Sequence, residues 1–141
     1  MYALGMNYLD GSSGFDINLP EGVRYIRMAA ERGYAKAQSD MGSMYSNGEG
    51  VPRDMKKAFD LYMQAAVQGF ARAQCNVGNA YNYGEGVDKD VNQSFIWYKK
   101  AADQGNTNAQ YNLGNDAGVF IIDVQYVHVY IYNNRMCIPR G

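Results

Sequence analysis

Few residues of this 141-residue chain are of the types that catalyse reactions. His128 is the single histidine, and no cysteine or serine that could serve as its nucleophilic partner lies near it in the sequence. Cys75 and Cys137 lack the spacing of a metal site or a redox motif, which favours a buried thiol at Cys75 over a disulfide. The sequence therefore predicts a protein that is not an enzyme and needs no cofactor or metal.

Two glutamates flanked by glycines offer the other candidate chemistry. Glu49 lies between Gly48 and Gly50, and Glu85 recurs in the same setting 36 residues later. Paired carboxylates can act as acid and base, but a charge on an exposed turn is the simpler interpretation. The segments are not phosphate-binding loops, because they follow predicted helices and lack a third glycine or a Lys-Ser/Thr pair.

These loops belong to a 36-residue repeat that occurs twice between residues 37 and 108. Fifteen of its 36 positions are identical without a gap, whereas average composition gives roughly two. A further copy opens at Ala109–Gly114, and Ala29, Ala30 and Gly33 belong to an earlier one. A fixed period of this size indicates a solenoid of stacked units.

Each unit has the pattern of two short amphipathic helices joined by the glycine loop. A glycine inside the first helix costs about 1 kcal/mol relative to alanine, so we expect the neighbouring helix to approach closely there. Asp54 is a good N-cap for the second helix, and Gly48 suits a left-handed C-cap of the first. The residues expected to hold the repeats together are Gly42, Tyr45, Gly78, Tyr81 and Gly114. The expected helices run near 2–10, 20–31, 37–47, 54–67, 73–83, 90–103 and 109–116.

The repeated residues resemble the Sel-1-like repeat, a branch of the tetratricopeptide superfamily. Its pattern is present as Ala109–Gly114, Gly84–Val87, Asp90 and Trp97–Ala102. The chain departs from that pattern at a few core positions, which are Met41 and Val77 for leucine, Leu61 for tryptophan, and Ser94 for alanine. All four are exchanges that a core tolerates.

The resemblance implies an all-α fold, a right-handed α/α superhelix of about three and a half helical hairpins over residues 1–116. The units are expected at about 1–36, 37–72 and 73–108, with a partial unit at 109–116. Residues 117–141 form an aberrant tail whose β-branched and aromatic residues favour strand. This tail is a hydrophobic cap, a helix imposed by its surroundings, or non-native sequence. The last account, together with a first unit that lacks its opening Ala-Gln, favours a fragment.

In tetratricopeptide-like solenoids the first helices of successive units line a concave groove. The residues that the resemblance assigns to partner binding there are Asp40, Ser43, Asn47, Asn76, Asn79, Tyr83, Asn112 and Asn115. Asparagine side chains can pair with a peptide backbone as donor and as acceptor; an alignment of asparagines is equally compatible with a solvated polar face. We expect Asn→Ala at Asn76, Asn79 or Asn112 to change stability by no more than about 0.5 kcal/mol.

The charge balance narrows the choice of partners. With 13 basic and 14 acidic residues the net charge is −1, which gives no electrostatic case for nucleic acid or an anionic membrane. No run of 18 apolar residues could span a membrane, and no signal peptide follows Met1, so a cytoplasmic location is expected if Met1 is the true start.

The resemblance implies a non-enzymatic scaffold or adaptor that binds a protein or peptide through its concave face. One alternative is a fragment of a longer repeat protein in a protein-quality-control or signalling complex. Another is a β-lactam-hydrolase-like enzyme, suggested by some cysteine-rich relatives, which needs paired cysteines that each repeat here lacks.

Overall fold

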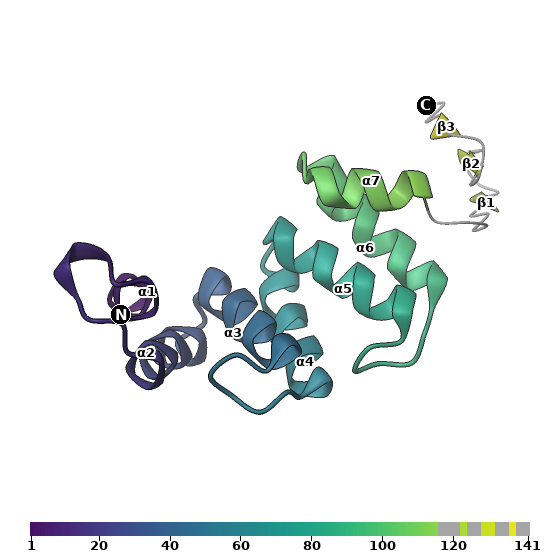
Figure 1. Ribbon diagram of the computed structural model, residues 1–141. Helices are drawn as coiled ribbons and strands as arrows, with labels where there is room; N and C mark the ends of the chain where they lie inside the picture. Colours follow the sequence, from purple (N-terminus) through teal and green to yellow (C-terminus); the bar gives the residue numbers. More distant parts are fainter. Residues whose placement is uncertain (116–121, 124–127, 132–135, 138–141) are drawn as a thin grey trace.

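The computed structural model describes residues 1–115, 122–123, 128–131 and 136–137. Within these residues seven α-helices follow one another along the chain (Figure 1): α1 (Tyr2–Asp10), α2 (Leu19–Glu31), α3 (Ala35–Asn47), α4 (Met55–Val67), α5 (Ala71–Tyr83), α6 (Val91–Asp103) and α7 (Thr107–Asn115). A short 3-10 turn, η1 (Ser12–Gly14), follows α1.

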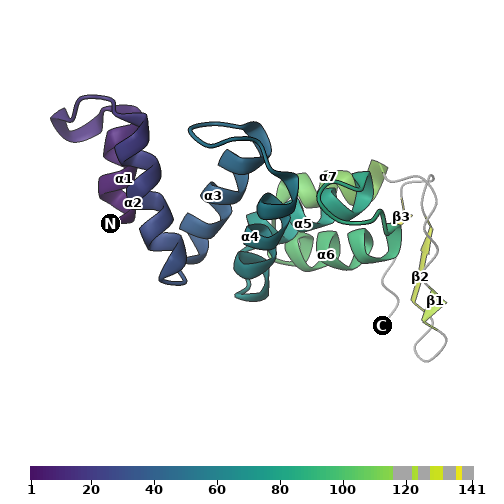
Figure 2. The same ribbon diagram turned by 90° about the horizontal axis from the view of Figure 1, so that it is seen from below.

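Each helix packs against the next one in the chain, so that α1–α2, α3–α4 and α5–α6 form hairpins and α7 is half of a fourth. Figure 2 shows the hairpins succeeding one another from α1 and α2 at one end to α6 and α7 at the other. The fold is the predicted all-α solenoid of three and a half hairpins.

Three short strands lie in the segment that the sequence predicts to be β-prone. They are β1 (Ile122–Asp123), β2 (His128–Ile131) and β3 (Met136–Cys137), paired antiparallel in the order β1-β2-β3. Ile122 pairs with Val129, and Tyr130 pairs with Cys137. The other residues of the predicted 117–141 tail lie outside the described residues.

The first helices of the hairpins begin two residues earlier than predicted, at Ala35, Ala71 and Thr107. Between α2 and α3 only Gly33 is left-handed, with a φ of 88°, and the amide of Tyr34 already returns to the carbonyl of Ala29 at 3.1 Å. The chain therefore turns within very few residues, and the next helix begins before the Ala-Gln pair. The predicted end at residue 116 lies outside the described residues, and every other predicted boundary agrees with the structure to within one residue.

In α3 and α5 the glycine inside the helix lies against a tyrosine ring of the second helix. A Cβ built on Gly42 would lie 2.7 Å from the ring of Tyr62, and one on Gly78 would lie 2.5 Å from the ring of Tyr98. Real Cβ atoms essentially never approach other atoms this closely. The expected close approach of the neighbouring helix is thus confirmed, and Tyr98 is fully buried by it.

The equivalent glycines of α1 and α7 have other surroundings. In α1 the equivalent Gly5 lies against Ile26. A Cβ on Gly114 in α7 would meet none of the described residues within 4 Å, so the predicted structural role of Gly114 has no contact to support it.

The predicted caps are present at the loops between the two helices of a hairpin. Asp54 accepts a hydrogen bond from the backbone N–H of Lys57 at 3.1 Å, and Asp90 caps α6 in the same way. Gly48 and Gly84 end α3 and α5 in the left-handed conformation, with φ of 68° and 69°. These short-range signals are what sequence patterns record best.

A ladder of buried glutamines joins successive hairpins. The Nε2 of Gln74 on α5 donates to the carbonyl of Ala66 in the last turns of α4, at 3.2 Å. The Oε1 of Gln74 accepts from the Nε2 of Gln104, which follows α6, at 2.7 Å. The same bonds recur one unit earlier, from Gln38 to Ala30 and from Gln68 to Gln38. Each such glutamine connects its own hairpin with the preceding one.

We predict that Gln74→Glu destabilises the protein in a pH-dependent way. At pH 7 the new carboxylate has no proton to donate to the carbonyl of Ala66, so the free energy of unfolding should fall by about 1–3 kcal/mol. Burial raises the pKa of such a carboxyl above its ordinary value of about 4.3. A folded-state pKa that is raised means that stability is recovered as the pH falls and the group takes up its proton.

The measurement is thermal unfolding of wild type and variant, followed by circular dichroism at pH 7 and pH 4. The matched control is Gln110→Glu, because Gln110 makes the corresponding bond to Ala102 at an exposed site. The deficit of Gln74→Glu should exceed that of the control and should shrink at pH 4. An equal deficit for Gln74→Glu at both pH values would contradict the role given to the buried amide.

Candidate functional site

A concavity of about 420 Å³ opens between α5 and α7. It brings together four of the eight residues predicted to bind a partner, Asn76, Asn79, Tyr83 and Asn112. The remaining lining residues are Arg72, Cys75, Glu85, Asn106 and Asn108. The concavity is therefore lined mainly by amides, with one guanidinium and one carboxylate among them.

Asn79 is a junction between three helices. Its Oδ1 accepts from the hydroxyl of Tyr98 on α6 at 2.6 Å and from the Nδ2 of Asn112 on α7 at 3.0 Å. Both lone pairs of that oxygen are thus used within the chain. The expectation that Asn79 affects stability little must be revised, because its amide supports the buried Tyr98.

Two other asparagines in the concavity have amides that are not engaged in this way. Asn76 is half-buried and Asn108 is exposed. Among the described residues, the side chain of neither one forms a hydrogen bond in the structure. Their donors and acceptors face the concavity as free recognition groups.

The predicted residues Asp40 and Ser43 on α3 lie outside the α5–α7 concavity and have internal partners. Asp40 accepts from the hydroxyl of Tyr2 on α1 at 2.6 Å and pairs with the guanidinium of Arg72 on α5. Burial, followed by the hydrogen bond to Asp40, raises the pKa of Tyr2 far above its ordinary value. Ser43 accepts from the hydroxyl of Tyr62 at 3.2 Å. These two residues therefore connect helices of the solenoid.

The last two predicted residues lie at helix ends. Asn47 is the exposed last residue of α3, and Asn115 is the last residue of α7. Arg72 and Asn108 were missed by the sequence analysis because the first helices were expected to begin at residues 73 and 109. The earlier helix starts put both of them on the lining helices, and the periodic apolar pattern carries no signal for this.

The groups around the concavity suit recognition better than reaction. Burial raises the pKa of the Cys75 thiol to about 11, so the thiol remains protonated and weakly nucleophilic at neutral pH. In the described part of the chain no three His, Cys, Asp or Glu residues are grouped so that they could hold a metal ion. None of the helices described is long and apolar enough to cross a membrane.

Stacked hairpins with an amide-lined concavity define an α-helical repeat protein of the solenoid class. The Sel1 repeat family model matches residues 1–34, 35–70, 71–106 and 107–124, and the chain belongs to the Sel1 repeat family. The second, third and fourth matches begin at the first residues of α3, α5 and α7. No curated protein matches the chain significantly.

Solved structures of Sel1-type proteins have the same fold. A Sel1 repeat protein from Oxalobacter formigenes is 43% identical over 79% of this chain and 83% of its own, with a TM-score of 0.75. The protective antigen c5321 of uropathogenic Escherichia coli, which displays an SLR fold, is 38% identical with a TM-score of 0.77 over 80% of this chain. The match covers only 24% of that antigen. The cysteine-rich protein B of Helicobacter pylori is 26% identical over 77% of this chain and 85% of its own, with a TM-score of 0.67.

We predict different stability effects for two neighbouring asparagines. Asn79→Ala removes the acceptor of the Tyr98 hydroxyl and should lower the free energy of unfolding by about 1–2 kcal/mol. Asn76→Ala removes no hydrogen bond and should change it by no more than about 0.5 kcal/mol. Urea unfolding of both variants is the measurement, with Asn76→Ala as the matched control. Equal effects of the two substitutions would show that the Tyr98–Asn79 bond contributes nothing.

A second prediction concerns the thiol of Cys75, measured in a Cys137→Ser background so that it is the one thiol present. Because its pKa rises from 9.0 to about 11, the thiolate fraction at pH 8 is about 100-fold smaller than that of a free thiol. Reaction with a disulfide reagent should be slower by a similar factor and should speed up in urea. The stability gained by burying the neutral thiol is complete below pH 9 and is lost as the pH approaches 11. A folded-state rate equal to that of free cysteine would contradict this burial.

Proposed function

We propose that this chain is a non-enzymatic scaffold or adaptor that binds an extended segment of a partner protein in the α5–α7 concavity. Sel1 repeat proteins are generally protein-interaction scaffolds. The observation that carries the proposal for this chain is the pair of free amides, at Asn76 and Asn108, that face one concavity of about 420 Å³.

The chemistry of the lining favours a polypeptide backbone as the ligand. An extended backbone presents N–H donors and C=O acceptors in alternation, and an asparagine amide can satisfy either. Neutral amides impose no charge requirement on the partner, in contrast to a lysine or arginine clamp for acidic termini. The segment is therefore recognised mainly through its main chain.

Three further residues of the lining add an aromatic surface and two charges to the site. Tyr83 is 69% exposed at the end of α5, and aromatic rings of this kind are enriched in protein interfaces because they bury a large area. Arg72 and Glu85 supply one charge of each sign. The guanidinium of Arg72 is already paired with Asp40, so an acidic residue of the bound segment would gain little from it.

The alternative of a β-lactam-hydrolase-like enzyme has no supporting group in the concavity. The only cysteine that lines it is Cys75, whose thiol is buried and held protonated. The sequence contains two cysteines in all, which cannot supply a pair in each repeat. We therefore do not propose this activity.

The test selects linear peptides from a displayed random library on the full chain. Their affinities are then compared between wild type and the double variant Asn76→Ala/Asn108→Ala. Each lost contact to a neutral polar group costs about 1 kcal/mol, so the double variant should bind about 10- to 30-fold more weakly. Isothermal titration calorimetry provides the affinities and thermal melting verifies that the fold is unchanged.

The matched control is Asn92→Ala, an exposed asparagine on α6 that does not line the concavity. It should leave the affinity unchanged. If the selected peptides bind the double variant as tightly as wild type, the contact surface lies elsewhere and the proposal is wrong. Failure to select any linear peptide would equally contradict it.

A further inference from the structure

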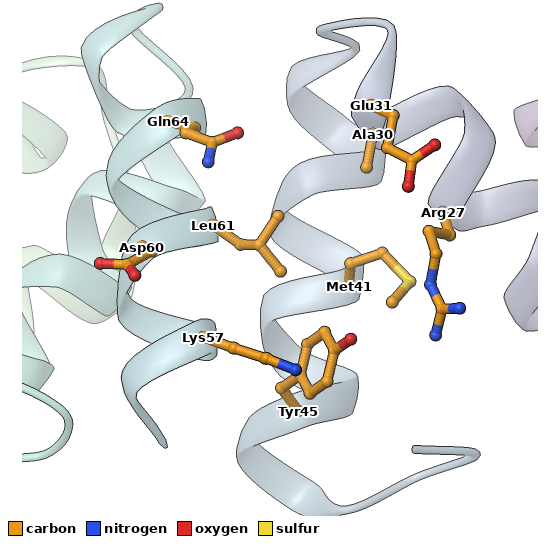
Figure 3. A pocket seen from close by; sticks show the side chains of 9 residues that line it. All are labelled: Arg27, Ala30, Glu31, Met41, Tyr45, Lys57, Asp60, Leu61 and Gln64. Atoms are coloured by element: carbon orange, nitrogen blue, oxygen red, sulfur yellow. The ribbon is translucent and has the colours of Figure 1, made fainter. Parts of the chain in front are cut away.

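A second pocket, of about 300 Å³, opens between α2 and α4 with α3 beneath it. Figure 3 shows Met41 and Tyr45 on the central helix, Leu61 pointing toward them from one side, and Ala30 on the other side. It shares no lining residue with the α5–α7 concavity. Its position between two second helices makes it a site distinct from the concavity.

The repeat itself shows what fits this pocket. One unit later, the equivalent position to Leu61 is Trp97. The side chain of Trp97 packs against a buried cluster that contains Ala66 and Val77, which are the counterparts of Ala30 and Met41. Because leucine is much smaller than tryptophan, the open volume beside Leu61 corresponds to the place that the indole takes in the next interface.

The rims of the two interfaces differ in charge. The pocket is bordered by Arg27, Glu31, Lys57 and Asp60, whereas the equivalent positions around the filled interface are Met63, Val67, Gln93 and Ile96. At the open pocket these charged side chains can contact a ring that enters from outside. The two cations and two anions of the rim balance, so a neutral group is favoured over an ion.

In both full units a lysine already lies over an aromatic ring. The Nζ of Lys100 lies 4.4 Å from the centre of the Trp97 ring, and the Nζ of Lys57 lies 5.4 Å from that of Tyr45. A ring in the pocket would present its electron-rich face to Lys57. The carboxylate of Glu31 on the opposite wall is an acceptor for the N–H of an indole. The electrostatics of the rim thus complement both the face and the edge of that ring.

We propose that this pocket receives the indole of a tryptophan side chain from a partner polypeptide. The aromatic side chain would occupy the apolar floor of Met41 and Leu61, in the manner of Trp97 in the next interface. A large ring buried in a pocket with a polar rim is the usual form of an interface anchor.

The primary test titrates isotope-labelled full chain with the blocked peptide Ac-Ala-Trp-Ala-NH2 and follows backbone amide resonances by NMR. The resonances of Ala30, Met41 and Leu61 should shift in a saturable way at millimolar peptide. Ac-Ala-Leu-Ala-NH2 at the same concentration should shift them at least 10-fold less. An absence of shifts at these residues, or equal shifts with both peptides, would overturn the proposal. So would binding of free indole without binding of the tryptophan peptide.

Leu61→Trp should fill the pocket from within. The variant should have a higher melting temperature than wild type and should bind the tryptophan peptide at least 10-fold more weakly. The matched control Leu61→Met should change neither the melting temperature nor the affinity by much. Melting below wild type would show that the volume does not fit an indole and would contradict the proposal. Lys57→Gln, which installs the residue found at position 93, should lower the affinity for the tryptophan peptide about 3-fold without changing the melting temperature, as expected for one cation–π contact.

Peptides selected on the α5–α7 concavity should bind Leu61→Trp as they bind wild type. The proposal for this pocket and the proposed function of the concavity are therefore tested independently.

Discussion

The contact between a glycine of the first helix and a tyrosine of the second sets the geometry of the α3–α4 and α5–α6 hairpins. At Gly42 and Gly78 the tyrosine ring lies where a Cβ would be, so the two helices approach more closely than any other residue would permit. The hydroxyl at the end of the ring reaches the residue that directly follows the glycine. There the hydroxyl of Tyr62 donates to Ser43, and that of Tyr98 donates to Asn79. The contact that fixes packing therefore also fixes two side chains of the predicted groove.

Stacking of the hairpins depends on the buried glutamines that join one hairpin to the next. The buried amides of Gln38 and Gln74 donate to the last turn of the preceding hairpin and accept from the end of their own. A buried amide that lost these partners would leave polar atoms without hydrogen bonds, which is costly. The ladder thus fixes the offset between units, and the spaces left between them depend on the side chains at the borders. The two pockets described above are such spaces, one between α5 and α7 and one between α2 and α4.

Local patterns sufficed to predict the helices and their caps, because each of these depends on neighbours within a few residues, whereas the tight glycines were indicated by their recurrence in the 36-residue repeat. What could not be predicted from the sequence depends on partners far along the chain. Asn79 meets Tyr98 and Asn112, which are 19 and 33 residues away, and nothing in a single helix distinguishes it from the unbonded Asn76. The starts of α3 and α5 were placed two residues late because Tyr34 and Phe70 are N-caps without a capping side chain. The start of α7 was placed late as well, although there the side chain of Asn106 accepts a hydrogen bond from the N–H of Ala109. That small error removed Arg72 and Asn108 from the predicted site.

Comparison of the units with one another separates the residues that hold the fold from those that can diversify. Positions that are identical in the two full copies include the glycine, the tyrosine and the glutamine whose contacts define hairpin and stack. Several positions that face the two pockets differ: Asp40 and Ser43 become Asn76 and Asn79, and Leu61 becomes Trp97. In a solenoid each unit interacts only with its neighbours, so such changes alter one surface without disturbing the others. Recognition in this chain is therefore expected where the repeat departs from itself, and an amide-lined concavity and an open pocket beside Leu61 can occur at two separate interfaces between hairpins.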